Sequence, residues 1–320
     1  MRLAVVGSGA IIPFHLEALT QVGFTVSCIA SRPGSESTRR IANDYSAKAL
    51  DTFRQIDPTS IDAVLIAPAA HALHEPLRHF LEAGTPILVE KPALCTVEEY
   101  LALGDLQSHQ VMVGYNRRHY SSVQTIKTNL TDKHFNSFHL QIPENSWNGP
   151  LDTKGRQENL VINTVHMFDL LRYLIEPNEI TVLGSKDSER SRYSSINLFV
   201  QGSQISGTVQ ITFNTPNSYR FEFSGNGCLQ VLQPIEVLRK FNGIEIVEPN
   251  SDFPIRRYLP KLDENGFEIH KVDQDFKPGF FRQAEEFANL VQGVPPRISA
   301  NLFDAMKAVE IAEMIKARFI

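Results

Sequence analysis

Two residues far apart in the chain, Lys91 and His166, have side chains suited to moving a proton. Lys91 lies in Glu90-Lys91-Pro92, directly after the apolar run 86–89. This predicts the carboxyl end of a parallel strand, where such sheets bind ligands. Pro92 restricts Lys91 to extended backbone geometry and so directs its side chain outward from the sheet. Burial or a neighbouring cation would lower the lysine pKa and suit it to proton transfer. The alternative is a surface lysine that pairs with Glu90.

Asn163, His166 and Asp169 are spaced i, i+3, i+6 in a segment, 158–175, that we predict to be one long helix. This spacing places the three side chains along one side of the helix. An imidazole titrates near neutral pH, so His166 is an eligible general acid or base, and Asp169 is placed to orient it. The other interpretation is a polar helix face in contact with solvent, and the pattern leaves both open.

The segment Gly7-Ser8-Gly9 indicates a binding site of another kind. It follows the apolar run 3–6 and precedes a helical pattern, and a second strand-like run covers 24–30. In a strand–turn–helix unit of this order, two glycines let the backbone approach a pyrophosphate that faces the positive end of the helix. The third glycine of the full motif is absent, because Ile12 stands there. The pattern predicts a dinucleotide site, with these expected contacts: Gly7, Gly9, Ala10, Ile11, Ser31, Arg32, Ala67, His71, Glu90 and Lys91.

The end of the second strand bears on which dinucleotide is bound. A carboxylate there accepts hydrogen bonds from the ribose of NAD, whereas a nearby arginine suits the 2′-phosphate of NADP. Here the strand ends in Ser31-Arg32, and no carboxylate precedes Glu36. The sequence therefore favours NADP, with NAD as the alternative and a solvated Arg32 as the simplest competing explanation.

The composition is that of an ordinary globular protein. The 320 residues are 42% hydrophobic and 21% charged, with a net charge of −5, and the sequence pI is near 6.1. Basic residues form no run, so we expect neither a nucleic-acid partner nor a membrane surface. Cys28, Cys95 and Cys228 are too widely spaced for a disulfide framework or a CxxC metal site, and we predict no metal. The chain begins directly with a strand and has no long apolar run, so a cytoplasmic protein is expected.

Strand-like and helical segments alternate through residues 1–118, which predicts an α/β fold with a doubly wound, mostly parallel Rossmann sheet. From residue 119 the pattern changes. A helix near 120–130 is followed by strand-like runs between 135 and 248, with Asn226-Gly227 and Asn242-Gly243 as expected hairpin turns. Helices return near 279–292 and 301–318. We therefore expect a dinucleotide-binding domain over 1–118 and a substrate and oligomerisation domain over 119–320. The second would be α+β with an open, largely antiparallel sheet, and its last helix would pack back on the first domain.

Five segments in matching order resemble the glucose–fructose oxidoreductase/inositol dehydrogenase (Gfo/Idh/MocA) family over essentially the whole chain. These are GSGAIIPFHLEAL, DAVLIA…HALH, LEAGTPILVEKPAL, VGYNRR and HMFDLLRYL. The resemblance implies an oxidoreductase that acts on sugars, cyclitols or their derivatives with NAD(H) or NADP(H). It also implies that Lys91 is the catalytic lysine, that His166 is the active-site histidine, and that the open sheet forms contacts between subunits.

The chain departs from the family pattern at one telling position. Family members commonly carry an Asp one helical turn before this histidine, where Ile162 stands here, and Asn163 is the nearest polar substitute. The glycine-rich lead-in to the helix is replaced by residues 156–159, and residues 68–70 are Pro-Ala-Ala where Thr-Pro-Asn is more usual. Either Asn163 substitutes for the Asp, the mechanism depends on Lys91 alone, or turnover has been lost.

These observations lead to one leading hypothesis and two alternatives. The leading hypothesis is an NADP-dependent dehydrogenase or reductase that acts on a CH–OH group of a sugar-like substrate and assembles as a dimer or tetramer through the C-terminal sheet. Candidates for lining its substrate pocket are Asn116, Arg117, Trp147 and Asp169. The alternatives are a regulator that senses dinucleotide or sugar without turnover, and a structural protein that binds no dinucleotide.

Overall fold

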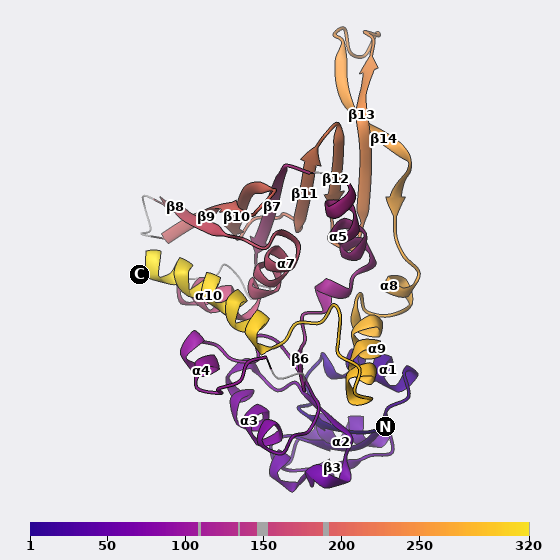
Figure 1. Cartoon of the computed structure of the whole chain (residues 1–320), viewed down its shortest axis with the longest axis vertical. Coiled ribbons are helices and arrows are strands. Elements are labelled where there is room, and N and C mark those ends of the chain that lie inside the picture. The colour runs from indigo at the N-terminus through magenta and orange to yellow at the C-terminus, as the bar shows by residue number, and fades with distance from the viewer. Residues whose placement is uncertain (108–109, 134, 146–152, 188–191, 320) are drawn as a thin grey trace.

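The computed structural model describes residues 1–107, 110–133, 135–145, 153–187 and 192–319. Two sheets dominate it: one of six strands, drawn in the lower half of Figure 1, and one of eight strands in the upper half. Helices α7 and α10 lie in the region where the two halves meet (Figure 1).

The six-stranded sheet has the order β3-β2-β1-β4-β5-β6, and every pair in it is parallel. This confirms the doubly wound N-terminal sheet expected from the alternating pattern. The strands are β1 (Arg2–Val6), β2 (Thr25–Ala30), β3 (Lys48–Leu50), β4 (Ala63–Ile66), β5 (Ile87–Val89) and β6 (Val111–Val113). The helices between them are α1 (Ile12–Gln21), α2 (Glu36–Asp44), α3 (His74–Glu82) and α4 (Val97–Leu101).

The central strands of this sheet are apolar throughout because helices cover both of its faces. Leu3 and Val5 face α1, α2 and a helix from much later in the chain, α9 (Phe280–Val291). Ala4 and Val6 face the side of α3 and α4. The sequence pattern did not predict the return of α9, since we expected the last helix to be the one that packs back.

The eight-stranded sheet has the order β14-β13-β12-β11-β7-β10-β9-β8, in which only the pairing of β7 with β10 is parallel. This confirms the largely antiparallel second sheet. Its strands are β7 (Ser137–Glu144), β8 (Glu179–Asp187), β9 (Arg192–Gln201), β10 (Ser206–Phe213), β11 (Arg220–Gly225), β12 (Cys228–Leu232), β13 (Leu238–Val247) and β14 (Arg257–Glu268).

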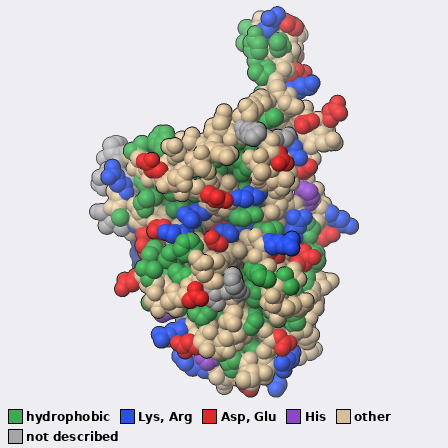
Figure 2. Space-filling view, in the orientation of Figure 1, with side chains coloured by type: hydrophobic (Ala, Val, Ile, Leu, Met, Phe, Trp, Pro, Cys, Tyr) green, Lys and Arg blue, Asp and Glu red, His purple; other side chains and the backbone are tan. Residues whose placement is uncertain are grey.

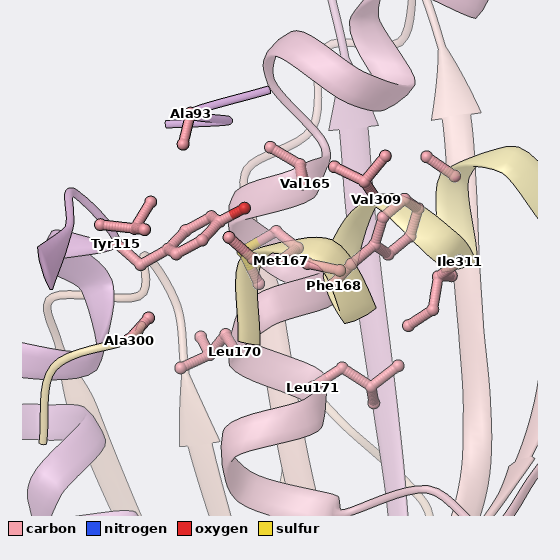
Figure 3. Packing of buried hydrophobic residues seen from close by; sticks show 14 of the residues in the cluster. Ala93, Tyr115, Val165, Met167, Phe168, Leu170, Leu171, Ala300, Val309 and Ile311 are labelled. Carbon is pink, nitrogen blue, oxygen red and sulfur yellow. The ribbon is translucent and has the colours of Figure 1, made fainter. Parts of the chain in front are cut away.

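Helices cover one face of this sheet. They are α5 (Ser121–Lys133), α6 (Thr153–Ile162), α7 (Val165–Ile175) and α10 (Leu302–Phe319), and the short α8 (Val272–Asp275) follows β14. Figure 3 shows apolar side chains of α7 gathered with Val309 and Ile311 of α10 and with Tyr115, which follows β6. The same apolar cluster includes Val64 of β4 and Leu140 of β7, so one core runs between the two sheets.

Three local expectations were wrong. The segment 158–175 is two helices, not one. Asn242-Gly243 lies inside β13, where the pairing with β14 shifts register, so it is not a hairpin turn. Strand β14 itself was not expected, because its proline and its charged and amide residues break the apolar alternation typical of strands. The boundary at residues 118 and 119 stays a prediction.

Candidate active site

The loop between β1 and α1 is a tight turn that only glycine permits at its first position. Gly7 has φ +116°, and a Cβ added there would lie 2.5 Å from the carbonyl oxygen of Ala67 at the end of β4. A Cβ added at Gly9 would meet no atom within 4 Å, because Gly9 borders open space. The two glycines therefore do different things: the first lets two strand ends approach each other, and the second leaves room for a ligand beside the backbone.

The amino end of α1 is available to an anion. Its N-cap, Ile11, makes no side-chain hydrogen bond, and the first turn carries no acidic residue. Within the described part of the chain, the backbone amides of Gly9, Ala10 and Ile11 donate no hydrogen bond. Free amides at a helix N-terminus, beside a glycine with open space, suit the pyrophosphate of a dinucleotide. The residues present therefore fit the cofactor that the sequence motif indicates.

This loop forms one wall of a groove of about 1370 Å³. The groove is lined by eight of the ten residues expected to contact a dinucleotide: Gly7, Gly9, Ala10, Ile11, Ser31, Arg32, Ala67 and His71. Glu90 and Lys91 do not line it, and their expected contact with the cofactor stays a prediction.

Hydroxyl groups gather at the end of the groove near Arg32. Ser37 lies 2.9 Å from Ser8 and 3.0 Å from Ser35, measured between hydroxyl oxygens. Ser35 also caps α2 by accepting a hydrogen bond from the amide of Thr38. A carboxylate from another strand lines the groove as well: Asp51, just after β3, accepts from the amide of Gly34 at 3.3 Å. This end of the groove thus offers a guanidinium, several hydroxyls and one carboxylate.

Lys91 extends from the end of β5 to the junction between α6 and α7. Its Nζ donates a hydrogen bond of 2.6 Å to the main-chain carbonyl of Ile162. Burial lowers the pKa of Lys91, and Arg117 lowers it further, while Glu90 and Glu144 act in the opposite direction. The amine therefore loses its proton more readily than an ordinary lysine does. This is the property that proton transfer near neutral pH requires.

Glu90 is held by a different partner from the one considered on sequence grounds. Its Oε1 lies 2.7 Å from Nε2 of His15, a buried residue of α1. Gly114, after β6, packs so closely that an added Cβ would lie 3.1 Å from the same oxygen. Glu90 therefore ties the ends of β5 and β6 to the first helix, and the surface ion pair with Lys91 is not formed.

His166 lies in the first turn of α7 among cations. Burial lowers its pKa well below the usual range, and Lys91, Arg117 and Lys277 add to that effect. Its ring packs edge-on against Tyr115, with 5.8 Å between centroids. Among the described residues its Nδ1 has no hydrogen-bond partner. The imidazole is therefore neutral at pH 7, and its low pKa makes the protonated form costly to reach at this position.

The break between α6 and α7 is organised by Glu144, the last residue of β7. Its buried carboxylate accepts hydrogen bonds from Asn159 at 3.1 Å, Asn163 at 2.8 Å and the Thr164 hydroxyl at 2.7 Å. The amides of Asn163 and Thr164 both reach the carbonyl of Asn159, so the helix ends at Ile162. Burial raises the pKa of Glu144, and the hydrogen bonds from Asn163, Thr164 and Asn159 oppose that effect by stabilising the ionised form. Asn163 therefore serves Glu144 and the hydroxyl of Tyr219, and it does not lie on a continuous helix face with His166.

Asp169 does not orient His166, which corrects the expectation drawn from their spacing. Both its oxygens accept hydrogen bonds from Arg118, the shortest at 2.6 Å, and its side chain is only 1% exposed. Burial raises the pKa of Asp169 to about 6, against the opposing charge of Arg118. Arg118 also contacts Asp304 of α10 at 3.2 Å. Asp169 is therefore part of a buried ion-pair network and not of a pocket wall.

The other expected substrate contacts have different fates. Asn116 is buried, and its amide donates to the carbonyl of Pro278 at 3.0 Å, so it joins the segment after β6 to the start of α9. Arg117 is partly buried, and its guanidinium lies over the ring of Tyr219, 4.4 Å from the centroid. Arg117 remains a candidate because its charge acts on both Lys91 and His166. Trp147 lies outside the described residues.

Sequence reasoning missed Glu144 and His15. Glu144 ends an ordinary strand pattern, and His15 sits on a helix face that otherwise reads as apolar. The one available signal was that each polar residue interrupts a buried apolar pattern, which is costly unless a partner is present. Within the described ranges, no three His, Cys, Asp or Glu side chains gather as a metal would need. No helix in that part of the chain has the length and apolar character to cross a membrane.

Comparison with known proteins agrees with the groove and the fold. Residues 1–116 match the family model of Gfo/Idh/MocA, described as an oxidoreductase family with an NAD-binding Rossmann fold. Inositol 2-dehydrogenase from Corynebacterium glutamicum (strain R) is 32% identical over 126 residues, which are only 37% of either chain. Inositol 2-dehydrogenase 1 from Saccharopolyspora erythraea is 24% identical over 290 residues, or 80% of this chain and 81% of that one.

Solved structures resemble the whole chain. A dehydrogenase from Clostridium difficile superimposes with a TM-score of 0.77 at 18% identity and covers 99% of each chain. Levoglucosan dehydrogenase in complex with NADH gives 0.75 at 18% identity, covering 99% of this chain and 96% of that one. At such identities the likeness establishes the two-sheet fold.

Proposed function

We propose that the chain is a member of the Gfo/Idh/MocA family, whose model matches residues 1–116, and that it is an NAD(P)-dependent dehydrogenase or reductase acting on a CH–OH group of a sugar, a cyclitol or a related compound. The observation that carries the proposal is the pairing of two features. One is the groove beside Gly9 and the uncapped α1. The other is the pair of buried basic groups, Lys91 and His166, whose pKa values are both lowered, that of His166 in part by Lys91. When bound, the nicotinamide supplies the hydride chemistry, and the protein must supply orientation and a route for the proton.

Lys91 and His166 are proposed to share the proton work. In the direction of oxidation, a neutral Lys91 accepts the proton of the substrate hydroxyl, because burial and Arg117 favour its uncharged form. The neutral imidazole of His166 is the second acceptor. In the direction of reduction the same amine, once protonated, returns the proton to the carbonyl oxygen. Ile162 accepts a hydrogen bond from the Lys91 amine through its main-chain carbonyl, so this position contributes no charge to the site.

We propose NADP as the preferred cofactor. Arg32 lines the groove just after β2, and Ser35 and Ser37 line the same groove at the amino end of α2. A guanidinium, hydroxyls and a helix N-terminus together suit a 2′-phosphate. NAD is the second candidate, because the carboxylate of Asp51 also lines the groove and can accept from ribose hydroxyls.

Fluorescence titration with NADPH and with NADH tests the site and the preference together. We expect both dinucleotides to bind and NADPH to bind more tightly than NADH. Arg32→Ala removes a partner of the 2′-phosphate and should therefore reduce the preference for NADPH by about tenfold. Asp51→Asn is the matched variant: it removes the carboxylate that could accept hydrogen bonds from the ribose of NADH, and it leaves Arg32 in place. A preference for NADPH that survives Arg32→Ala would show that Arg32 does not read the phosphate. Absence of binding by either dinucleotide would defeat the proposal as a whole.

Turnover is tested with myo-inositol, levoglucosan and UDP-N-acetylglucosamine, chosen because related proteins carry these names. Each compound is supplied with NAD⁺ and, separately, with NADP⁺, and the reduction of the dinucleotide is followed by absorbance. Oxidation of any polyol or sugar supports the proposed activity. Tight dinucleotide binding without turnover across a wide panel of such compounds would instead favour the sensing regulator.

A further inference from the structure

Two basic side chains, Lys91 and Arg117, reach the junction between α6 and α7 from different elements. The amine of Lys91 extends from the end of β5 and donates to the carbonyl of Ile162. Arg117 lies in the segment after β6, and its Nη1 is 2.6 Å from the sulfur of Met167, the residue that follows His166. The charges of both side chains act on the imidazole. Two cations from separate parts of the chain therefore lie close to His166.

Arg117 has no acidic partner in the part of the chain that the structure describes. Its guanidinium donates to the sulfur of Met167, a weak acceptor, and no described Asp or Glu forms an ion pair with it. The adjacent Arg118 is the opposite case, because Asp169 and Asp304 both bind it. Basic and acidic side chains are also interspersed over the face of the molecule drawn in Figure 2. A partly buried guanidinium without a counterion is costly, so this one is suited to binding an anion.

Tyr219 holds this guanidinium and adds a donor of its own. Arg117 lies over the ring, 4.4 Å from its centroid. A guanidinium held over a ring keeps its N–H groups at its edge, where a carboxylate or a phosphate can accept two parallel hydrogen bonds. The hydroxyl of Tyr219 accepts from Asn163 at 3.2 Å and donates to no other described residue, so its proton is available to the same ligand. All three side chains are partly exposed, which lets a ligand reach them.

Lys277, in the segment before α9, is a third cation near the histidine. Its charge also acts on His166, and no described acid forms an ion pair with it. Its Nζ lies 4.7 Å from the ring centroid of Phe14 and 6.0 Å from that of Phe280. Phe14 belongs to α1, the helix whose amino end borders the dinucleotide groove. Lys277 is therefore close both to that helix and to the histidine.

The acids of this region are engaged elsewhere. Glu144 accepts three hydrogen bonds from the α6–α7 junction, and Glu90 is tied to α1. Both charges act on Lys91, but neither carboxylate forms an ion pair with Arg117 or Lys277. A neutral polyol would leave these two cations without a counterion, whereas an anionic group would supply one.

We propose, on the premise of the dehydrogenase activity proposed above, that the substrate carries a carboxylate or a phosphate group, which Arg117 and Tyr219 bind with Lys277 close by. The substrate class is then a sugar acid or a sugar phosphate, and not a neutral polyol. A bound anion would also offset the cations that lower the pKa of His166, so that protonation of the imidazole becomes less costly.

Phenylglyoxal, a reagent that modifies arginine side chains, tests the anion site without any turnover. Mass spectrometry of peptides follows each arginine while sodium chloride keeps the ionic strength constant. D-glucuronate, D-glucose 6-phosphate, acetate and inorganic phosphate are compared with D-glucose as the neutral control. We expect at least one carboxylate or phosphate to slow modification of Arg117 by about tenfold and D-glucose to leave it unchanged. Arg220, which is already paired with Glu222, is the internal control and should not respond.

The pattern of protection decides the proposal. Acetate and D-glucuronate identify a carboxylate site, and inorganic phosphate and D-glucose 6-phosphate identify a phosphate site. Protection by D-glucose equal to that of the anions overturns the proposal. So does a rate for Arg117 that none of the four anions lowers below the rate in sodium chloride alone. Protection of Arg117 in a protein that transfers no hydride would defeat only the enzymatic activity.

Kinetics of two variants separate the anion from the rest of the substrate. Arg117→Gln should lower kcat/KM for an anionic substrate by about 100-fold, mainly through KM, because a charge-assisted pair is lost. Arg220→Gln, the matched control one residue after Tyr219, should change it by less than about threefold. Thermal unfolding checks that both variants fold. A neutral sugar that the unmodified protein oxidises faster than the corresponding acid or phosphate overturns the proposal and leaves the dehydrogenase activity in place.

Discussion

The amine of Lys91 is surrounded by charges that act on its pKa in opposite directions. Glu90 and Glu144 favour its charged form, whereas burial and Arg117 favour its neutral form and prevail. Lys91 therefore loses its proton more readily than an ordinary lysine, and the main-chain carbonyl of Ile162 orients the amine without adding a charge. Burial lowers the pKa of His166 as well, and Lys91, Arg117 and Lys277 lower it further, so its imidazole is neutral at pH 7.

Replacing Lys91 with Met keeps a long unbranched side chain and removes the amine. We expect kcat to fall by about 10²- to 10⁴-fold, the usual range for loss of a general acid or base. Dinucleotide affinity should stay nearly unchanged, since Lys91 does not line the groove. Steady-state kinetics and fluorescence titration on the same preparation separate the two effects. A Lys91→Met enzyme of normal kcat would remove the lysine from the mechanism.

Glu144→Gln tests whether the buried carboxylate tunes the amine. The negative charge of Glu144 raises the pKa of Lys91, so removing it should lower that pKa further. Because oxidation needs the neutral amine, the acidic limb of the pH–rate profile should move to lower pH in Glu144→Gln. Thr164→Val is the matched control: it removes one hydrogen bond to the carboxylate and keeps the charge. A profile displaced to higher pH, or equally displaced in both variants, would contradict the electrostatic role.

Among single residues, the sequence correctly indicated those that stand in a short local motif. Gly7, Gly9 and Lys91 stand in short patterns whose geometry is fixed by neighbouring residues, and the groove gathers the glycines as expected. Asp169 was misassigned because its partner, Arg118, lies 51 positions earlier and no local spacing reveals it. Glu144 was missed for the same reason, since its three donors come from residues 15 to 20 positions later.

At the scale of elements, apolar periodicity predicted the parallel sheet well because buried strands and amphipathic helices alternate there. It failed where a side chain from another element decides the local structure. The helix expected over 158–175 ends at Ile162 because Glu144 engages Asn163 and Thr164. Strand β14 was not predicted because most of its residues on both faces are exposed, so it lacks the alternation that burial imposes.

The segment after β6 carries a pH-sensitive contact between elements. His119 is buried, and its Nε2 lies 3.0 Å from the hydroxyl of Ser299, while Glu286 of α9 binds the same hydroxyl. Burial lowers the pKa of His119 from 6.5 to about 4, helped by Arg118 and Arg282 and opposed by Glu286. Between pH 6.5 and about pH 4, His119 is therefore protonated in the unfolded chain and neutral in the folded protein. Stability should therefore fall as pH drops from about 6.5 towards 4.

We expect this single group to remove about 2 kcal/mol of unfolding free energy between about pH 7 and about pH 5. In His119→Gln the loss over that interval should shrink by a similar amount, because glutamine does not titrate. Urea denaturation at the two pH values measures the difference. The pKa of Glu286 is lowered, so that carboxylate stays ionised across the interval and does not confuse the comparison. An unchanged pH dependence in His119→Gln would mean that folding does not lower the pKa of His119.

In the molecule as a whole, segments that are far apart in the sequence pack together across the two halves. One apolar cluster spans both sheets, and Arg118 links the segment after β6 to α7 through Asp169 and to α10 through Asp304. Helix α9 belongs by sequence to the second half, yet it packs in the cluster that covers β1 and β4. A boundary at residue 118 marks the change of sequence pattern but leaves one face of the first sheet incompletely covered.

Phe287 of α9 tests whether the two halves unfold together. It is fully buried and stacks on Phe24, which precedes β2, with 5.5 Å between ring centroids and 15° between planes. Phe287→Ala should lower the free energy of unfolding by about 3–5 kcal/mol in one urea transition. The matched control, Phe253→Ala in the segment between β13 and β14, removes an exposed ring and should cost under about 1 kcal/mol.

Hydrogen exchange shows where the Phe287→Ala effect is felt. If α9 completes the first sheet, the amides of β1 and β4 should lose protection in the variant to the same extent as those of α9 itself, although residue 287 is more than 200 positions away in sequence from either strand. Should β1 and β4 keep their protection while α9 alone exchanges faster, residues 1–118 would be a self-sufficient folding unit and α9 only a lid resting on it.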